Sequence, residues 1–392
     1  MSKIVNINSS MDDGMKEYHK KLRNHRIGVL TRSLVIALVI ILSVVGIRFY
    51  FNNRSFSEYM VASTVERTDT LNTKYALFGG QILKYSRDGI SYTDLENNLL
   101  FSITFTMQEP LLVLGDNAGV VADKNGNQIY VFNKSNQTGQ ITTLLPIKQV
   151  AVSDQGIVAI LLEDAKKSKL EVYLADGTLL ADGEFTLDDA GYPMDLAIAA
   201  DGTKFSISSA KVEGTRFSSC VGIYNLDDVG ENHEDNLVFT KDYVDYMIPE
   251  IHYFGASNLA AVGDGILAFY QGTQIPEITK EITFEEEIKS VHYGTDNVGL
   301  VFQTEEGNML KLFDLKGNVI AEIPFHMNYE EIYILDNRVI VYNQTEMGLY
   351  SYSGKEAFHQ IFETPVINVF PTKSRNKYMF VYANETQLVK LK

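Results

Sequence analysis

The side chains best suited to binding a metal ion are concentrated in one acidic stretch, residues 225–250. It contains Asp227, Asp228, Glu231 and His233. Oxygen ligands that lie close together in sequence are suited to Ca²⁺, but the spacing here matches no EF-hand loop. We therefore expect a solvated surface loop, and keep these four residues as candidate metal ligands in the alternative interpretation.

Two histidines occupy similar positions in sequence segments that lie 40 residues apart. His252 is found in the segment EIHYFG and His292 in SVHYG. Neither has a second histidine two or four positions away, so no zinc-binding pattern is present. We expect a structural histidine repeated in successive units, and keep His252 and His292 as candidate binding residues.

No catalytic motif is found. The sequence contains no G-x-S-x-G, S-x-x-K, H-E-x-x-H or P-loop pattern. Cys220 is the only cysteine, which excludes an intramolecular disulfide. It lies next to Val221 in a strand-like run, where it is expected to belong to the core. We therefore predict no catalytic residue and no cofactor.

One segment is apolar enough to enter a membrane. Residues 33–47 carry no charge and lie between Arg32 and Arg48. Such a helix spans about 22 Å, and flanking arginines and aromatic residues can extend it toward the ~30 Å of a bilayer core. A cleaved signal peptide is the alternative, but no small-residue cleavage site follows. We predict a transmembrane signal anchor at 33–51.

The charges around this segment predict its orientation. Residues 1–54 have a net charge of +6, which leaves −22 for residues 55–392. The positive-inside rule then places the N-terminus in the cytoplasm and the large domain outside the cytoplasmic membrane. So acidic a domain would repel phosphates, which excludes nonspecific nucleic-acid binding.

Beyond residue 73, short apolar runs alternate with turn pairs such as Asp176-Gly177, which is typical of β-strands. One type of run recurs eight times, every 38 to 51 residues. Its copies start at Ile90, Ile129, Leu170, Val221, Ile266, Met309, Gly348 and Thr386. Such a period, with four short strands per unit, is typical of a β-propeller. We predict an all-β propeller of eight four-stranded blades. Seven blades or a split β-sandwich are the alternatives.

The last repeat ends at the C-terminus and leaves its blade without an outermost strand. The run Tyr59–Thr64 could supply that strand and close the ring. The predicted organisation is a cytoplasmic basic tail at 1–32, the anchor at 33–51, a stalk with this closing strand at 52–72, and the propeller at 73–392.

The chain resembles a family of uncharacterised single-pass membrane proteins from Gram-positive, mainly clostridial, bacteria. The resemblance rests on Ile82–Ser91, Leu145–Ile147, Val150–Ser153, Gly191–Asp195 and Asp201–Lys204. The family is known only as a domain of unknown function. The resemblance implies a signal-anchored, WD40-like propeller, and brings no activity and no site residues.

These features favour a binding or scaffolding module. The expected partners are the cytoplasmic membrane, through one helix, and an envelope protein, peptide or glycan. The alternatives are a metal-assisted hydrolase or lyase at the propeller funnel, and the ectodomain of a sensor. The chain has no tryptophan, whereas eight-bladed quinoprotein dehydrogenases rely on tryptophan-docking motifs, so it is not a typical member of that group.

Overall fold

The computed structural model describes residues 7–52, 54–70, 72–164, 167–186, 191–213 and 215–392. Residues 1–6 of the predicted tail and residues 53 and 71 of the predicted stalk lie outside the described residues. The chain divides into two compact units, Met1–Arg54 and Ser55–Lys392.

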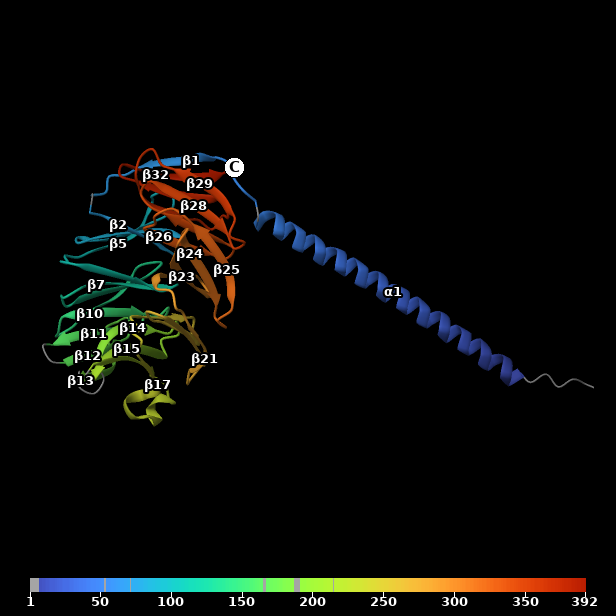
Figure 1. The fold of residues 1–392 in the computed structure, drawn as a ribbon, viewed down its shortest axis with the longest axis horizontal. Helices are drawn as coiled ribbons and strands as arrows, with labels where there is room; N and C mark the ends of the chain where they lie inside the picture. The colour runs from blue at the N-terminus through green and yellow to red at the C-terminus, as the bar shows by residue number, and fades with distance from the viewer. Residues whose placement is uncertain (1–6, 53, 71, 165–166, 187–190, 214) are drawn as a thin grey trace, which may run out of the picture. The chain divides into compact units, whose positions relative to one another are not determined.

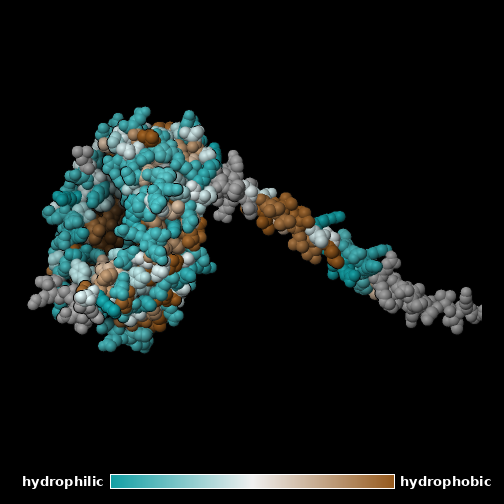
Figure 2. Space-filling view, viewed as in Figure 1, coloured by the Kyte–Doolittle hydropathy of each residue, from teal (hydrophilic) through white to brown (hydrophobic). Residues whose placement is uncertain are grey.

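The first unit contains the helix α1 (Ile7–Asn52). Within it, Tyr18–Val44 is long and apolar enough to cross a membrane, which is also true of a signal sequence. A helix of this length reaches about 40 Å, more than the ~30 Å hydrocarbon core. Figure 2 shows hydrophobic residues along part of α1 and hydrophilic residues along its N-terminal part.

In the second unit, the described strands form eight four-stranded antiparallel sheets, which confirms the predicted eight-bladed propeller (Figure 1). Blades 1 and 2 consist of β2 (Lys74–Phe78), β3 (Gln81–Ser86), β4 (Gly89–Thr93), β5 (Leu99–Thr104), β6 (Pro110–Leu114), β7 (Ala118–Asp123), β8 (Gln128–Asn133) and β9 (Gln137–Thr142). Blades 3 and 4 consist of β10 (Ile147–Val152), β11 (Val158–Asp164), β12 (Lys167–Tyr173), β13 (Leu179–Thr186), β14 (Tyr192–Ile198), β15 (Lys204–Glu213), β16 (Arg216–Asn225) and β17 (Leu237–Val244).

Blades 5 and 6 consist of β18 (Glu250–Phe254), β19 (Asn258–Val262), β20 (Ile266–Gln271), β21 (Glu277–Thr283), β22 (Ile288–Tyr293), β23 (Asn297–Thr304), β24 (Gly307–Asp314) and β25 (Val319–Phe325). Blades 7 and 8 consist of β26 (Glu331–Leu335), β27 (Arg338–Tyr342), β28 (Glu346–Ser351), β29 (Glu356–Ile361), β30 (Val366–Pro371), β31 (Lys377–Tyr382), β32 (Glu385–Leu391) and β1 (Tyr59–Glu66). The eight recurring runs of the sequence are the third strands of these blades, β4, β8, β12, β16, β20, β24, β28 and β32.

The position of a strand within its blade explains its composition. Inner and middle strands are covered on both faces, so β20 reads ILAFYQ and all of its residues except the last are buried. Outermost strands have one covered face, so β25 reads VIAEIPF and alternates between exposed and buried positions after its first two residues. Turn glycines such as Gly177 adopt positive φ, as the Asp-Gly pairs predict.

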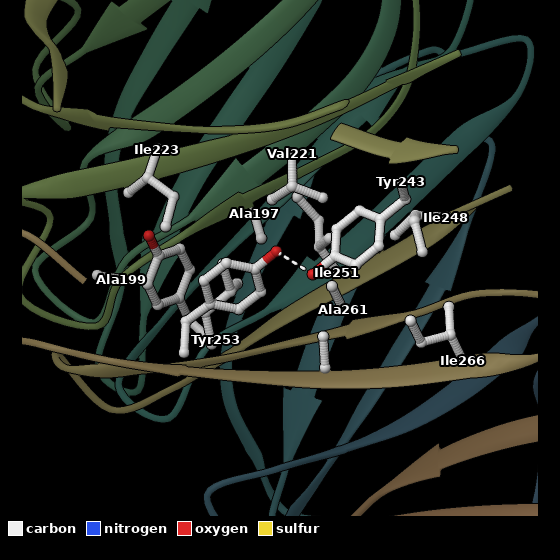
Figure 3. Close-up of a cluster of buried hydrophobic side chains, with 13 residues drawn as sticks. Ala197, Ala199, Val221, Ile223, Tyr243, Ile248, Ile251, Tyr253, Ala261 and Ile266 are labelled. Atoms are coloured by element: carbon white, nitrogen blue, oxygen red, sulfur yellow. Dashed lines mark hydrogen bonds between the residues drawn. The ribbon is translucent and has the colours of Figure 1, made fainter. Parts of the chain in front are cut away.

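Aromatic and aliphatic side chains fill the space between neighbouring blades. Between blades 4 and 5, Val221 and Ile223 pack in one cluster with Ala261 (Figure 3). The hydroxyl groups of Tyr243 and Tyr270 share a hydrogen bond inside this cluster, so no buried phenol is left unpaired there. In a chain without tryptophan, tyrosine and phenylalanine provide this interblade volume.

The ring is closed by strands from opposite ends of the chain. β1 pairs antiparallel with β32, from Tyr59 opposite Leu391 to Glu66 opposite Glu385. β1 therefore becomes the outermost strand of blade 8, whose other three strands end the chain. This pairing confirms the prediction that the run beginning at Tyr59 closes the ring.

Removing β1 should destabilise the ring. We expect a fragment of residues 55–392 to remain soluble and β-rich, and a fragment of residues 67–392 to unfold at lower urea concentration. The difference should be several kcal/mol, because each lost backbone hydrogen bond contributes about 0.5–1.5 kcal/mol and Tyr59 also packs on Phe380. Urea unfolding followed by far-UV circular dichroism measures it. Equal midpoints for the two fragments would show that β1 is dispensable.

Candidate binding site in the central channel

The innermost strands enclose a cavity of about 910 Å³ at the centre of the ring. Its walls come from the first strands of blades 1 to 7, namely β2, β6, β10, β14, β18, β22 and β26, and from the loops that follow several of them. Figure 2 shows a hollow with a hydrophobic interior on this face of the propeller unit. A cavity of this volume is in the range of ligand pockets.

Polar groups hold the loops at one end of the channel together. Asp154 Oδ1, which follows β10, accepts hydrogen bonds from the backbone N–H groups of Asp116 (2.6 Å) and Asn117 (3.2 Å), which follow β6. Lys134 Nζ donates to Asn117 Oδ1 at 2.9 Å. The rim is therefore a fixed set of polar groups on neighbouring blades.

Along the channel wall, polar side chains join each inner strand to the next. Gln149 in β10 and Asp195 in β14 each follow a shift of register in their strand pairing. Gln149 Nε2 donates to the carbonyl oxygen of Met194 at 2.6 Å, and Asp195 Oδ2 accepts the Ile251 N–H at 2.8 Å. An inner strand has no further strand on its channel side, so these side chains pair backbone groups that would otherwise be unsatisfied.

A cluster of titratable groups lies around Asp195. Burial raises the pKa of Asp195 to about 6. Burial raises the pKa of Glu250, a hydrogen-bonding interaction with Tyr293 partly offsets this shift, and the charge of Asp195 adds to it. Burial and the charges of Glu250 and Asp195 raise the pKa of Tyr293. The Tyr293 hydroxyl is shielded from solvent and lies beside the Glu250 carboxyl, but among the described residues no group forms a well-formed hydrogen bond with it. Three acidic groups on β14, β18 and β22 therefore influence one another inside the channel wall.

The two candidate histidines lie at equivalent positions of neighbouring inner strands, β18 and β22. The ring of His252 stacks on Tyr293 at 4.1 Å and lines the cavity. His292 bonds Ser290 Oγ through Nε2 at 2.9 Å and faces Tyr329, away from the cavity. Burial lowers the pKa of each histidine to about 4, so both are neutral at physiological pH. The structure brings only His252 of this pair to the channel.

The acidic stretch forms the connection between β16 and β17, which contains the short 3₁₀ helices η1 (Gly230–Asn232) and η2 (Glu234–Asn236). Asp227, Asp228, Glu231 and His233 are all exposed there. In the part of the chain that the structure describes, no three His, Cys, Asp or Glu side chains are grouped to hold one metal ion. The stretch lies on the surface, and its role as a metal site stays a prediction.

Asp195, Glu250 and Tyr293 are not among the site residues predicted from the sequence. Asp195 interrupts the apolar run of β14, and a charged residue within such a run is the signal that could have identified it. Its contacts with blade 5 could not be read from the run itself, because Ile251 lies in a different unit of the repeat.

A sequence model described as a family of unknown function (DUF5711) matches residues 52–391. The chain belongs to this family. The match covers the whole propeller together with β1, in agreement with the resemblance seen in the sequence. A comparison with curated proteins finds no match.

Solved structures with a similar fold include BamB from Moraxella catarrhalis, with 10% identity, a TM-score of 0.51, and coverage of 85% of this chain and 100% of that one. Sqt1 from Saccharomyces cerevisiae is 12% identical, with a TM-score of 0.54 and coverage of 86% and 98%. A eukaryotic initiation factor is 11% identical, with a TM-score of 0.53 and coverage of 86% and 88%. At such low identity the likeness concerns the fold alone.

Replacing Asp195 should change how stability depends on pH. Because the pKa of Asp195 is higher in the folded protein, the stability from its bound proton is fully present below about pH 4 and is lost as the pH rises past about 6. In Asp195→Asn, the amide oxygen can still accept the Ile251 N–H. We expect the unfolding free energy of the wild type, relative to this variant, to fall by on the order of 2 kcal/mol between pH 4 and pH 7.

Urea unfolding across this pH range measures the effect. Gln149→Ala removes the corresponding contact in blade 3 without touching a titratable group, so its difference from the wild type should stay constant with pH. A difference between wild type and Asp195→Asn that also stays constant would contradict the burial assigned to Asp195.

Proposed function

We propose that this protein is a membrane-tethered, extracytoplasmic β-propeller that binds and holds a partner of the cell envelope. The observation that carries the proposal is a closed ring with a hollow centre, joined through residues 53–58 to an apolar helix. A closed ring presents fixed loops and a preformed cavity, and such a surface suits recognition of a protein, a peptide or a wall glycan. The family resemblance adds an expected origin in Gram-positive bacteria.

The order of the elements along the chain supports a mechanically stable attachment of the propeller to the helix α1. In the sequence, α1 ends at Asn52 and the next element is β1, which begins at Tyr59 and is the outermost strand of blade 8. A pull on the helix therefore acts on a strand that is paired along most of its length with β32. A module that holds a partner at a membrane needs such an attachment, because a loosely held terminal strand would peel from its blade.

Charge supports the assigned sides of the membrane. The segment before the span is basic and the propeller is acidic, so the positive-inside rule retains the N-terminus in the cytoplasm. The acidic domain would be repelled by anionic lipid. A domain on the outer side that stands away from the bilayer remains free to meet an envelope partner.

This topology can be tested with single cysteines in a Cys220→Ser background. Leu144 is 94% exposed on the propeller, and His25 is exposed in the N-terminal part of α1. We expect a membrane-impermeant maleimide to label Leu144→Cys in intact cells, and to label His25→Cys only after the cells are lysed. Labelling of His25→Cys alone in intact cells would reverse the proposed orientation.

Partner binding can be tested by photo-crosslinking in the membranes of the cells that produce the protein. A photoreactive residue at Asn117, on the rim of the channel, should give a discrete crosslinked product. The same residue at Val319, an exposed position of the outermost strand β25, serves as the matched control and should give none. Absence of a discrete product from Asn117, or equal products from both positions, would argue against a partner held at the channel.

A further inference from the structure

We propose that the channel wall formed by blades 4, 5 and 6 binds an ammonium or guanidinium group, which a lysine or arginine side chain of the partner supplies. This inference rests on the proposed function, because it names the chemical group by which the partner is recognised. Asp195 on β14, His252 on β18 and Tyr293 on β22 line the cavity at this site, and Glu250 on β18 acts on Tyr293 from within the wall.

The groups at this wall accept hydrogen bonds. The Asp195 carboxylate accepts the Ile251 N–H and also interacts with the Leu196 N–H, and two oxygens with about four lone pairs leave room for a ligand. Burial keeps His252 neutral, and its ring packs against Phe254 and Tyr293. A neutral imidazole offers one accepting nitrogen. An ammonium group carries three donors and a guanidinium five, so both are complementary to this wall.

The carboxyl groups of Asp195 and Glu250 have no positively charged side chain as a partner among the described residues. Within the described residues, no lysine, arginine or histidine forms an ion pair with Asp195 or Glu250, whereas Asp69 elsewhere in the propeller pairs with both Arg67 and Lys84. A buried carboxylate without a counter-charge is costly, and a bound cation would remove that cost. This imbalance favours a positively charged ligand over an apolar or anionic one.

An independent observation points to the same place. The hydroxyl of Tyr293 is shielded from solvent and lies beside the Glu250 carboxyl, but no described residue completes a well-formed hydrogen bond with it. Buried hydroxyl groups are nearly always paired in folded proteins, so an orphan beside two carboxyls marks a site whose polar network lacks a member. A donor placed between these groups would complete that network.

The remainder of the cavity suits a side chain that enters from a larger partner. Among its described lining residues, three aspartates, Asp116, Asp154 and Asp195, are accompanied by one lysine, Lys134. Lys134 bonds Asn117 and lies over the ring of Phe78, so it is already engaged. The negative rim would attract a cation, and the apolar walls would contact the methylene groups of a lysine or arginine stem.

A metal ion fits this wall less well. Asp195, Glu250 and His252 are not grouped so that they could hold one metal ion together, and no other three His, Cys, Asp or Glu side chains of the described residues are. An organic cation needs only hydrogen-bond acceptors and an opposite charge, and Asp195 with His252 provides both.

The test uses the full chain in nanodiscs of zwitterionic lipid and fluorescent pentalysine as the probe, at neutral pH and physiological salt. We expect Asp195→Asn to weaken pentalysine binding about tenfold, because a charge-assisted contact is lost while the hydrogen bond to Ile251 remains possible. We expect His252→Phe, which keeps an aromatic ring against Tyr293, to weaken it about threefold. Acetylated pentalysine, which has no side-chain charge, should not bind.

The matched control is Asp123→Asn. Asp123 Oδ1 also accepts two backbone N–H groups, from Gln108 and Glu109, and it lies outside the cavity lining. Asp123→Asn should leave pentalysine binding within twofold of the wild type. Equal losses in Asp195→Asn and Asp123→Asn would show diffuse attraction to an acidic surface, which would overturn the proposal.

Competition with spermidine distinguishes the two possible sources of the cation, which are a side chain of a partner and a free polyamine. Competition by spermidine that is tenfold weaker than by unlabelled pentalysine supports a side chain of a partner. Spermidine that binds tenfold more tightly than pentalysine overturns that assignment in favour of a free polyamine.

The cation site and the proposed binding function can also fail separately. If the crosslinked partner is still found unchanged in Asp195→Asn, the proposed cation site is contradicted and the proposed binding function stands. If pentalysine binding depends on Asp195 but no crosslinked partner is found, the proposed function of holding a partner is contradicted.

Discussion

The pairing of β1 with β32 is the interaction on which the rest of the propeller depends. Blades are held only by their neighbours, so a ring has two ends that must be joined. Here the join is made inside blade 8, where a strand from the start of the propeller completes a sheet formed by the end of the chain. Once the ring is closed, every blade has a neighbouring blade on both sides.

The closed ring leaves unpaired backbone groups of the inner strands around its centre, and the candidate site includes side chains that pair them. Inner strands face the channel with backbone groups that no further strand can pair. Gln149 and Asp195 meet this need from equivalent positions, one with an amide and the other with a carboxylate. The carboxylate places a charge in a desolvated wall next to Glu250 and Tyr293. Such a cost to stability is typical of positions that are kept for binding.

Much of the architecture could be predicted from the sequence, because strand composition repeats with the blade. The recurring run from Ile90 to Thr386 identified the third strand of every blade, and the unpaired last blade identified Tyr59–Thr64 as the closing strand. The candidate site was harder to predict. His252 was singled out from its likeness to His292, yet the two rings meet different environments, since one stacks on Tyr293 in the channel and the other bonds Ser290. Asp195 was overlooked within an apolar run.

By itself, the sequence determined the period of the blades, the apolar helix, the charge difference between the two units and the need for a closing strand. These are properties of local composition, and each can be read within one segment. Only the tertiary structure decided which polar side chains share the channel wall. Asp195, Glu250 and Tyr293 come from three successive blades, and their pKa values depend on burial and on one another's charges. Those quantities exist only when the ring brings the inner strands together.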